Sequence, residues 1–181
     1  MIYIEELTNT RHSQPSMVAG ISSKILQIRK ESIKQSLTDI HTIEHRQDFV
    51  AAVDGVMYYD DSRAENVNAT WFTFENIIRP VIWIAGGSNS EADFKDLKKV
   101  TKKKVKALIC IGSSNEGLKK ALNKDIKDIY EVNSLEEAVN MASLLAKEND
   151  IVLFSPACKS DHETYIERGN LFAKTVKQLK K

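Results

Sequence analysis

The feature that most constrains the fold is an unbroken apolar run, Val81-Ile82-Trp83-Ile84-Ala85, which follows Pro80 and ends at Gly86-Gly87. A strand that is apolar on both faces of its pleat must be buried on both sides, as at the centre of a parallel sheet covered by helices. In open sheets of this kind, ligands bind in a crevice at the carboxyl ends of the strands. The run therefore predicts a central strand, and Gly86-Gly87 marks the edge where a ligand is expected.

Strands and helices are predicted to alternate on both sides of this run. Residues 49–53 and 56–59 are two short strand-like runs on either side of Asp54-Gly55, which indicates a β-hairpin. The helix expected over residues 66–78 has Val67, Trp71, Phe74 and Ile78 on one apolar stripe. Further helices are expected at 93–105, 116–122, 135–146 and up to about 180, with strands at 107–111, 129–132 and 151–154. The pattern predicts an α/β, Rossmann-like, doubly wound and mostly parallel sheet, with the hairpin as an antiparallel edge.

The N-terminal residues are expected to form a separate, small helical segment. Ser16 indicates the N-cap of a helix that runs to Leu26, and residues 31–37 have the spacing of a second short helix. Two such helices bury little surface by themselves, so we expect them to pack against the main domain or a neighbour. We therefore divide the chain into a helical segment, residues 1–41, and an α/β domain, residues 42–181.

Composition excludes several classes of function. The 26 basic and 25 acidic residues nearly cancel, so the chain has no overall attraction for nucleic acid or an anionic membrane. No apolar run approaches the ~18 residues that span a bilayer, and the N-terminus is not a signal peptide. Cys110 and Cys158 have neither metal-ligand spacing nor the number needed for a disulfide framework. These features favour a reduced, cytoplasmic compartment.

The strongest site candidate is Asp61-Ser62-Arg63-Ala64-Glu65-Asn66, because a strand end that leads into a helix presents charged side chains and free backbone N–H groups. The alternative is an ordinary helix N-cap. Arg46 could pair with a phosphate or carboxylate, or simply lie on the surface. Ser155 could donate to an anion or cap the last helix. Cys158 is not expected to be a nucleophile, since His162 is the only nearby residue that could activate a thiol.

These segments are expected to meet at the carboxyl edge of the sheet. We predict a pocket between residues 61–66, 86–90 and 155–158, with residues 112–115 close by. The chain has no glycine-rich loop of the Walker or dinucleotide type. It is therefore not expected to hold a triphosphate by itself.

Several of these motifs, in this order, resemble the Mur ligases. They are His45-Arg46, the hairpin, Asp61-Ser62-x-Ala64-x-Asn66, Gly86-Gly87, and Ser155-Pro156-Ala157-Cys158 followed by Glu167-Arg168-Gly169. Residues from about 45 onward resemble the C-terminal domain, and residues 16–40 resemble the last helices of the central ATPase domain. The branch that joins D-glutamate to UDP-N-acetylmuramoyl-L-alanine is the most similar. The resemblance implies an ATP-dependent amide-bond ligase of peptidoglycan synthesis that acts through an acyl phosphate, with magnesium.

The resemblance also implies roles for single residues. Nucleotide contacts are expected from Arg46, Asp61, Arg63 and Asn66, and amino-acid contacts from Glu65, Ser90, Ser155 and Cys158. No residue is expected to be catalytic or to bind a metal, and the chain alone is expected to bind neither ATP nor magnesium and to be inactive. The implied partners are a D-glutamate-like amino acid, UDP-N-acetylmuramoyl-L-alanine, and an ATPase domain or a second copy that contacts residues 1–41.

Departures from the family pattern support an alternative. Arg63 and Ser90 replace lysines, Glu65 replaces a threonine, and Asp161-His162 stands in a shortened stretch that lacks a phenylalanine. One negative charge gained and one positive charge lost should weaken D-glutamate binding by at least about a hundredfold. With Met1 at the start and no ATPase domain, these changes favour a degenerate, standalone paralogue that serves as a non-catalytic binding or interaction module.

Overall fold

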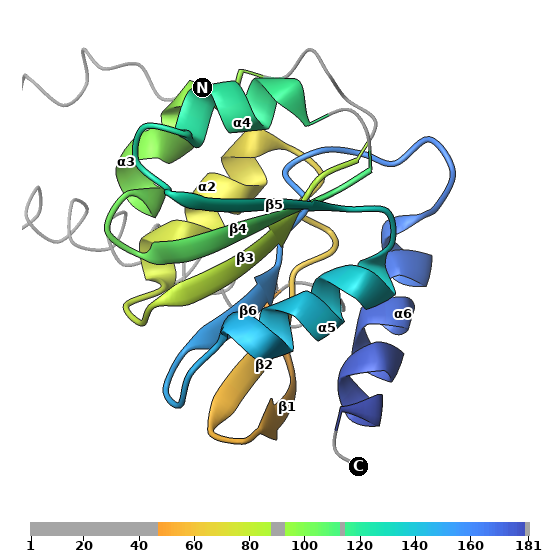
Figure 1. Cartoon of the computed structure of the whole chain (residues 1–181). Coiled ribbons are helices and arrows are strands. Elements are labelled where there is room, and N and C mark those ends of the chain that lie inside the picture. Colours follow the sequence, from red (N-terminus) through yellow and green to blue (C-terminus); the bar gives the residue numbers. More distant parts are fainter. Residues whose placement is uncertain (1–46, 88–92, 113–114, 180–181) are drawn as a thin grey trace, which may run out of the picture. The chain divides into compact units, whose positions relative to one another are not determined.

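The computed structural model describes residues 47–87, 93–112 and 115–179. The helical segment predicted at residues 1–41 lies outside this part, as do Arg46 and Ser90. The described strands form one sheet, ordered β1-β2-β6-β3-β4-β5, in which β1 and β2 are antiparallel and the other neighbours are parallel (Figure 1). The strands are β1 (Asp48–Val53), β2 (Val56–Asp60), β3 (Val81–Ala85), β4 (Val105–Ile111), β5 (Asp128–Val132) and β6 (Ile151–Phe154). The predicted α/β sheet with an antiparallel hairpin edge is confirmed.

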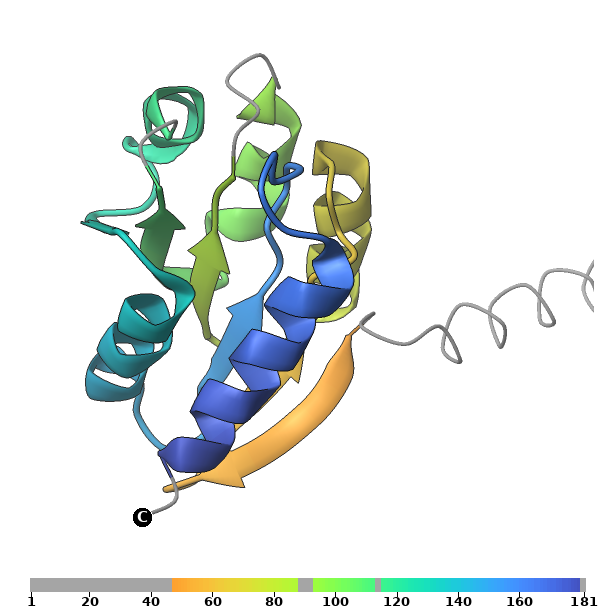
Figure 2. The ribbon, with the colours of Figure 1, turned by 90° about the vertical axis from the view of Figure 1, so that its right-hand side faces the viewer.

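Helices cover both faces of the sheet (Figure 2). One face packs against α2 (Val67–Asn76), η2 (Phe94–Asp96), α3 (Leu97–Thr101) and α4 (Glu116–Leu122), and the other against α5 (Leu135–Leu145) and α6 (Tyr165–Gln178). Each face has its own apolar core: Phe74, Leu97 and Leu118 belong to the first, and Val139 and Phe172 to the second. The result is a three-layer domain whose sheet is buried from both sides.

Strand β3 lies between β6 and β4, and all five of its residues are buried. Trp83 contacts the ring of Phe74 edge-on, with 5.0 Å between ring centroids. Its indole Nε1 donates a hydrogen bond of 2.8 Å to the backbone carbonyl of Ser155, so its polar atom is also satisfied inside the core. The central position predicted from the apolar run is confirmed.

Two predicted helices differ from the structure. In α2 the buried side chains are Thr70, Thr73 and Phe74, whereas Trp71 is 39% exposed and Ile78, beyond the helix end, is 94% exposed. Apolar spacing misses this face because the two threonine hydroxyls have buried hydrogen-bond partners. The helix predicted at 93–105 ends at Thr101, because residues 102–104 form a turn and residue 105 begins β4.

The chain path places a topological switch point between β3 and β6. After β3 the chain continues through α3 to β4 on one side, and after β6 it continues to α6, which packs against β1 and β2 on the other. Neighbouring strands whose connections diverge in this way leave a crevice at their carboxyl ends. The architecture therefore directs attention to the residues that directly follow β3 and β6.

Candidate functional site

The segments predicted to meet at the carboxyl edge do meet there. The backbone N–H of Gly86 donates to the carbonyl of Pro156 (3.0 Å), and the N–H of Ala157 donates to the carbonyl of Ala64 (2.9 Å). Asn115 is buried and donates from Nδ2 to the carbonyls of Ile111 and Gly112 (3.1 and 2.6 Å). The first two bonds join the ends of β2, β3 and β6, and those of Asn115 hold the start of α4 against the end of β4.

Glycine is required where β3 ends because neighbouring backbone approaches closely. Gly86 has a φ of +120°, and a Cβ built on it would lie 2.5 Å from the carbonyl oxygen of Ile111. A Cβ on Gly87 would collide with the carbonyl oxygen of Lys159. Any side chain at either position would therefore push the converging segments apart.

A buried polar cluster lies on the α2 side of this edge; we call it the Asp61 cluster, made of Asp61, Thr70, Thr73 and Ser155. Asp61 Oδ2 accepts hydrogen bonds from Thr73 Oγ1 (2.7 Å) and Ser155 Oγ (2.8 Å), and the Thr70 and Ser155 hydroxyls are 3.0 Å apart. Asp61 is 1% exposed and Ser155 0% exposed. The structure thus gives both residues a role in joining β2, α2 and β6, and their predicted ligand contacts stay predictions.

Asn66 and Arg63 lie nearer the surface. Asn66 is the N-cap of α2, and its Oδ1 accepts from the N–H of Ala69 at 2.9 Å, so the N-cap alternative is confirmed for this residue. The exposed guanidinium of Arg63 lies over the ring of Tyr165, 5.1 Å from its centroid, and donates to the phenol oxygen at 3.3 Å. Arg63 therefore presents a positive charge to solvent beside the start of α6.

The two cysteines are buried near the same edge. Burial raises the pKa of the Cys110 thiol to about 12, with the Glu131 carboxylate adding to the effect. Cys158 Sγ contacts the carbonyl oxygen of Pro156 at 3.4 Å. Both side chains pack as small apolar groups, and Cys158, predicted to line the amino-acid site, lies beneath the surface.

Glu65 has a partner that sequence reasoning missed. Its Oε1 lies 2.9 Å from Nη2 of Arg168 in α6, whose side chain is 6% exposed. The negative charge of Glu65 is therefore compensated within the chain, and the strong repulsion of D-glutamate expected from it is not supported by this geometry. The Glu167-Arg168-Gly169 motif was visible in the sequence, but nothing local connected Arg168 with a residue 103 positions earlier.

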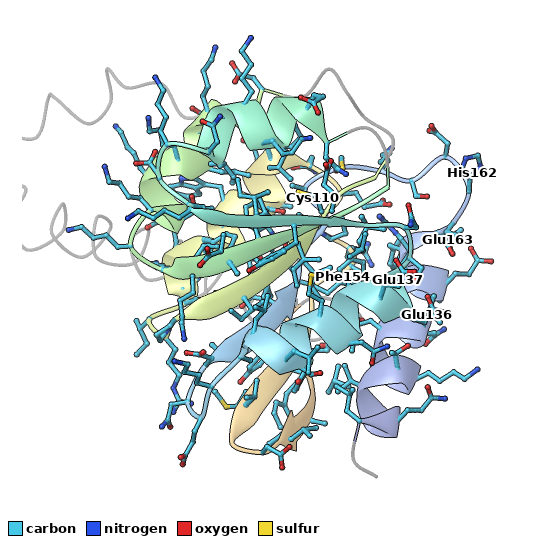
Figure 3. The ribbon with its side chains drawn as sticks, viewed as in Figure 1. Cys110, Glu136, Glu137, Phe154, His162 and Glu163 are labelled. Carbon is cyan, nitrogen blue, oxygen red and sulfur yellow. The ribbon has the colours of Figure 1, made fainter. Side chains whose placement is uncertain are left out.

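Next to this ion pair lies a cavity of about 190 Å³; we call it the Arg168 cavity. Figure 3 shows Glu136 and Glu163 where the first turn of α5 comes close to the loop before α6. The wall is formed by Gly86, Gly87, Ile111, Asn133, Ser134, Leu135, Glu136, Phe154, Ser160, Glu163, Arg168 and Leu171. Of these wall residues, only Gly86 and Gly87 belong to the segments that were predicted to line the pocket. Buried hydrogen bonds fill the space between residues 61–66 and 155–158, so the opening lies toward α5 and α6 instead.

A larger cavity, of about 430 Å³, lies on the opposite side of the sheet beneath α2. Its wall includes Met57, Tyr59, Ile77 and Arg79, and Met57 and Ile151 stand at or near the beginnings of their strands. It therefore lies away from the carboxyl edge. We take the smaller Arg168 cavity as the candidate site because it lies at the switch point and contains a buried charged group.

The described residues show no metal centre and no membrane span. Within them, no cluster of three or more His, Cys, Asp or Glu side chains is arranged to hold a metal ion. No helix among them combines the length and apolar character needed to cross a bilayer.

Comparisons with known proteins agree with this architecture. The family model described as "Mur ligase, glutamate ligase domain" matches residues 45–158. UDP-N-acetylmuramoylalanine–D-glutamate ligase of Salinibacter ruber is 36% identical over 91% of this chain, and the enzyme of the same name from Porphyromonas gingivalis is 38% identical over 94%. The chain spans only 36% and 38% of the lengths of these two relatives.

A solved structure shows the same fold at low sequence identity. It is the bifunctional folylpolyglutamate synthase/dihydrofolate synthase of Yersinia pestis, complexed with AMPPNP and a manganese ion. It matches 74% of this chain and 31% of its own length, with a TM-score of 0.50 and 17% identity.

Proposed function

This chain belongs to the Mur ligase family, and from that premise we propose that it is the C-terminal, amino-acid-binding domain of a ligase that joins D-glutamate to UDP-N-acetylmuramoyl-L-alanine. The observation that carries the proposal is the match to D-glutamate ligases over more than nine tenths of the chain. The geometry supports it with a small cavity at the switch point, lined by a buried arginine. Peptidoglycan synthesis in the cytoplasm is the corresponding biological setting.

In such a ligase, ATP supplies the phosphoryl group that activates the acceptor carboxylate. The described residues do not fit a complete site for ATP and magnesium, because they include no metal-holding cluster and Asp60 and Asp61 are 2% and 1% exposed. Arg63 is an exposed cation at this edge that fits contact with a phosphate. The proposed work of this domain is therefore to bind and orient the amino acid, while the nucleotide is held mainly by the ATPase part of the ligase.

The degenerate-module alternative rested on the substituted site residues, together with Met1 at the start and the lack of an ATPase domain. Glu65 is the most disruptive of these in sequence, yet its charge is paired with Arg168. The family match and this compensation favour the ligase domain over a module that has lost its site.

A domain exchange tests the proposed function. Residues 42–181 would replace the equivalent part of the Salinibacter ruber enzyme, and ATP-dependent addition of D-glutamate to UDP-N-acetylmuramoyl-L-alanine would be measured. The matched control is the same exchange with the Porphyromonas gingivalis domain. We expect both chimeras to add D-glutamate. Neither chimera should release phosphate without forming product. A folded chimera that fails to add D-glutamate, beside an active control chimera, would refute the proposal.

A further inference from the structure

We propose that Arg168 is a specificity-determining residue that binds a carboxylate of the amino-acid substrate inside the Arg168 cavity, and that Glu65 holds its guanidinium in place for this contact. The inference rests on the proposed function and deepens it. It names a ligand-binding side chain at a position outside all the segments that sequence reasoning assigned to the site.

The first support is the incomplete hydrogen bonding of Arg168. Its Nη2 donates to Glu65, but its buried Nε has no hydrogen-bond partner among the residues that the structure describes. A buried donor without an acceptor is costly, and a guanidinium is suited to a second, planar carboxylate. The same side chain lines the cavity. A carboxylate in the cavity would contact this side chain, and a shift of the guanidinium toward the ligand would give the unpaired, buried Nε donor an acceptor.

The second support is the charge of the cavity wall. The positive charge of Arg168 is balanced by its partner Glu65. Glu136 and Glu163 add two exposed carboxylates, so the charge around the cavity is negative overall. A simple dianion would meet net repulsion there. An amino acid brings its own ammonium group, which the rim carboxylates favour, while its carboxylate contacts Arg168. The wall thus selects for a zwitterion over a plain carboxylic acid.

The third support is size. A volume of about 190 Å³ is small for a ligand site and suits a molecule of the size of an amino acid better than a nucleotide. Gly86 and Gly87 form part of this wall, and both are tightly packed against neighbouring backbone. A side chain at either glycine would therefore clash with this backbone, which keeps the wall near β3 free of side chains.

Glu65 acts as a positioning residue in this arrangement. Its carboxylate fixes one end of the guanidinium through a 2.9 Å contact, which limits the directions in which the remaining donors point. Its charge also cancels that of Arg168, so the neutral ion pair attracts a ligand carboxylate less than the arginine alone would. Replacing Glu65 by glutamine keeps an acceptor for Arg168 and removes the charge, so Glu65→Gln should bind D-glutamate more tightly.

The test is an NMR titration of the full chain with D-glutamate at millimolar concentration, following the backbone amides and the arginine Nε–H signals. Arg168→Lys keeps the positive charge opposite Glu65 but lacks the planar fork, and it should bind at least about tenfold more weakly. Glu65→Gln should bind about fivefold more tightly. The matched control is Arg79→Lys, an arginine at the other cavity, which should leave the affinity unchanged. Glutarate, which lacks the ammonium group, should bind at least about tenfold more weakly than D-glutamate.

The supporting result is a shift of the Arg168 Nε–H signal in the wild type, together with opposite affinity changes in the two site variants. Unchanged affinity in folded Arg168→Lys would overturn the inference. The inference would also be overturned if neither the wild type nor Glu65→Gln binds D-glutamate. This second outcome keeps the inference testable if Arg168→Lys does not fold. An inactive chimera in the domain exchange, beside D-glutamate binding that depends on Arg168, would refute the proposed function and leave this site standing.

Discussion

The Asp61 cluster and the Arg168 cavity lie on opposite sides of the same strand ends, yet they differ in how their polar groups are satisfied. Asp61 has two hydroxyl donors and is 1% exposed. Arg168 is nearly as deeply buried but keeps a donor without a partner in the described part of the chain, beside an open space. Charged residues at a sheet edge can thus serve the fold or the ligand, and hydrogen-bond satisfaction distinguishes the two better than position does.

The largest effect is expected from Asp61→Ala. It leaves the hydroxyls of Thr73 and Ser155 without their buried acceptor, so the free energy of unfolding should fall by about 3 kcal/mol. Urea denaturation measures the loss. Asp96→Ala, at an exposed aspartate, should cost less than about 0.5 kcal/mol. Equal unfolding midpoints for the two variants would show that the Asp61 cluster does not hold the fold together.

The next effect separates close packing from backbone conformation. Gly86 and Gly112 both have positive φ, +120° and +82°, but only at Gly86 would a Cβ meet neighbouring atoms. Gly112→Ala should cost about 1 kcal/mol from the left-handed backbone alone, and Gly86→Ala about 2 kcal/mol more. Thermal and urea unfolding of both variants would be compared. Similar losses would mean that the edge between β3 and β4 is looser than the structure shows.

A third prediction concerns how well water is excluded from the core on the α2 face of the sheet, to which the Cys110 side chain belongs. The pKa of Cys110 is raised from 9.0 to about 12, chiefly by burial, so folding favours the neutral thiol. The resulting stability is complete below pH 9 and is lost as the pH rises from 9 to 12, because the unfolded chain ionises first. At pH 10 the wild type should lose about 1.4 kcal/mol relative to pH 8, beyond the loss in Cys110→Ala. Parallel losses in the two proteins would contradict a dry environment for this thiol.

The smallest effect is expected at Arg63, which belongs to neither region. Its contact with the Tyr165 ring is exposed, so Arg63→Ala should lower the free energy of unfolding by only about 0.5–1 kcal/mol. Tyr165→Leu, which removes the ring from the other side, should cost a similar amount. A loss as large as that of Asp61→Ala would place Arg63 in the structural network after all.

The sequence predicted the parts of the fold that depend on local pattern. The apolar run at residues 81–85 and the Asp54-Gly55 hairpin specify burial and direction within a few residues, and both were correct. The face of α2 was not predictable in this way. Thr70 and Thr73 are buried because Asp61 and Ser155 bond to them, and those partners come from other strands.

The candidate site was predictable only in outline. The switch-point rule identified the correct edge of the sheet, and the glycines marked its closest backbone approach. The buried charged side chain of the cavity wall comes from α6, where no residue near Arg168 in sequence indicates its partner. Its pairing with Glu65 spans 103 residues, so only the folded chain shows that the two charges belong together.

A crystal structure of the chain with D-glutamate tests the division between the two regions most directly. We predict a ligand carboxylate within about 3 Å of the Arg168 guanidinium, while the hydrogen bonds of Asp61 to Thr73 and Ser155 stay as they are. D-glutamate bound to Ser155 or Asp61, with those hydrogen bonds broken and Arg168 still contacting Glu65 alone, would contradict the account.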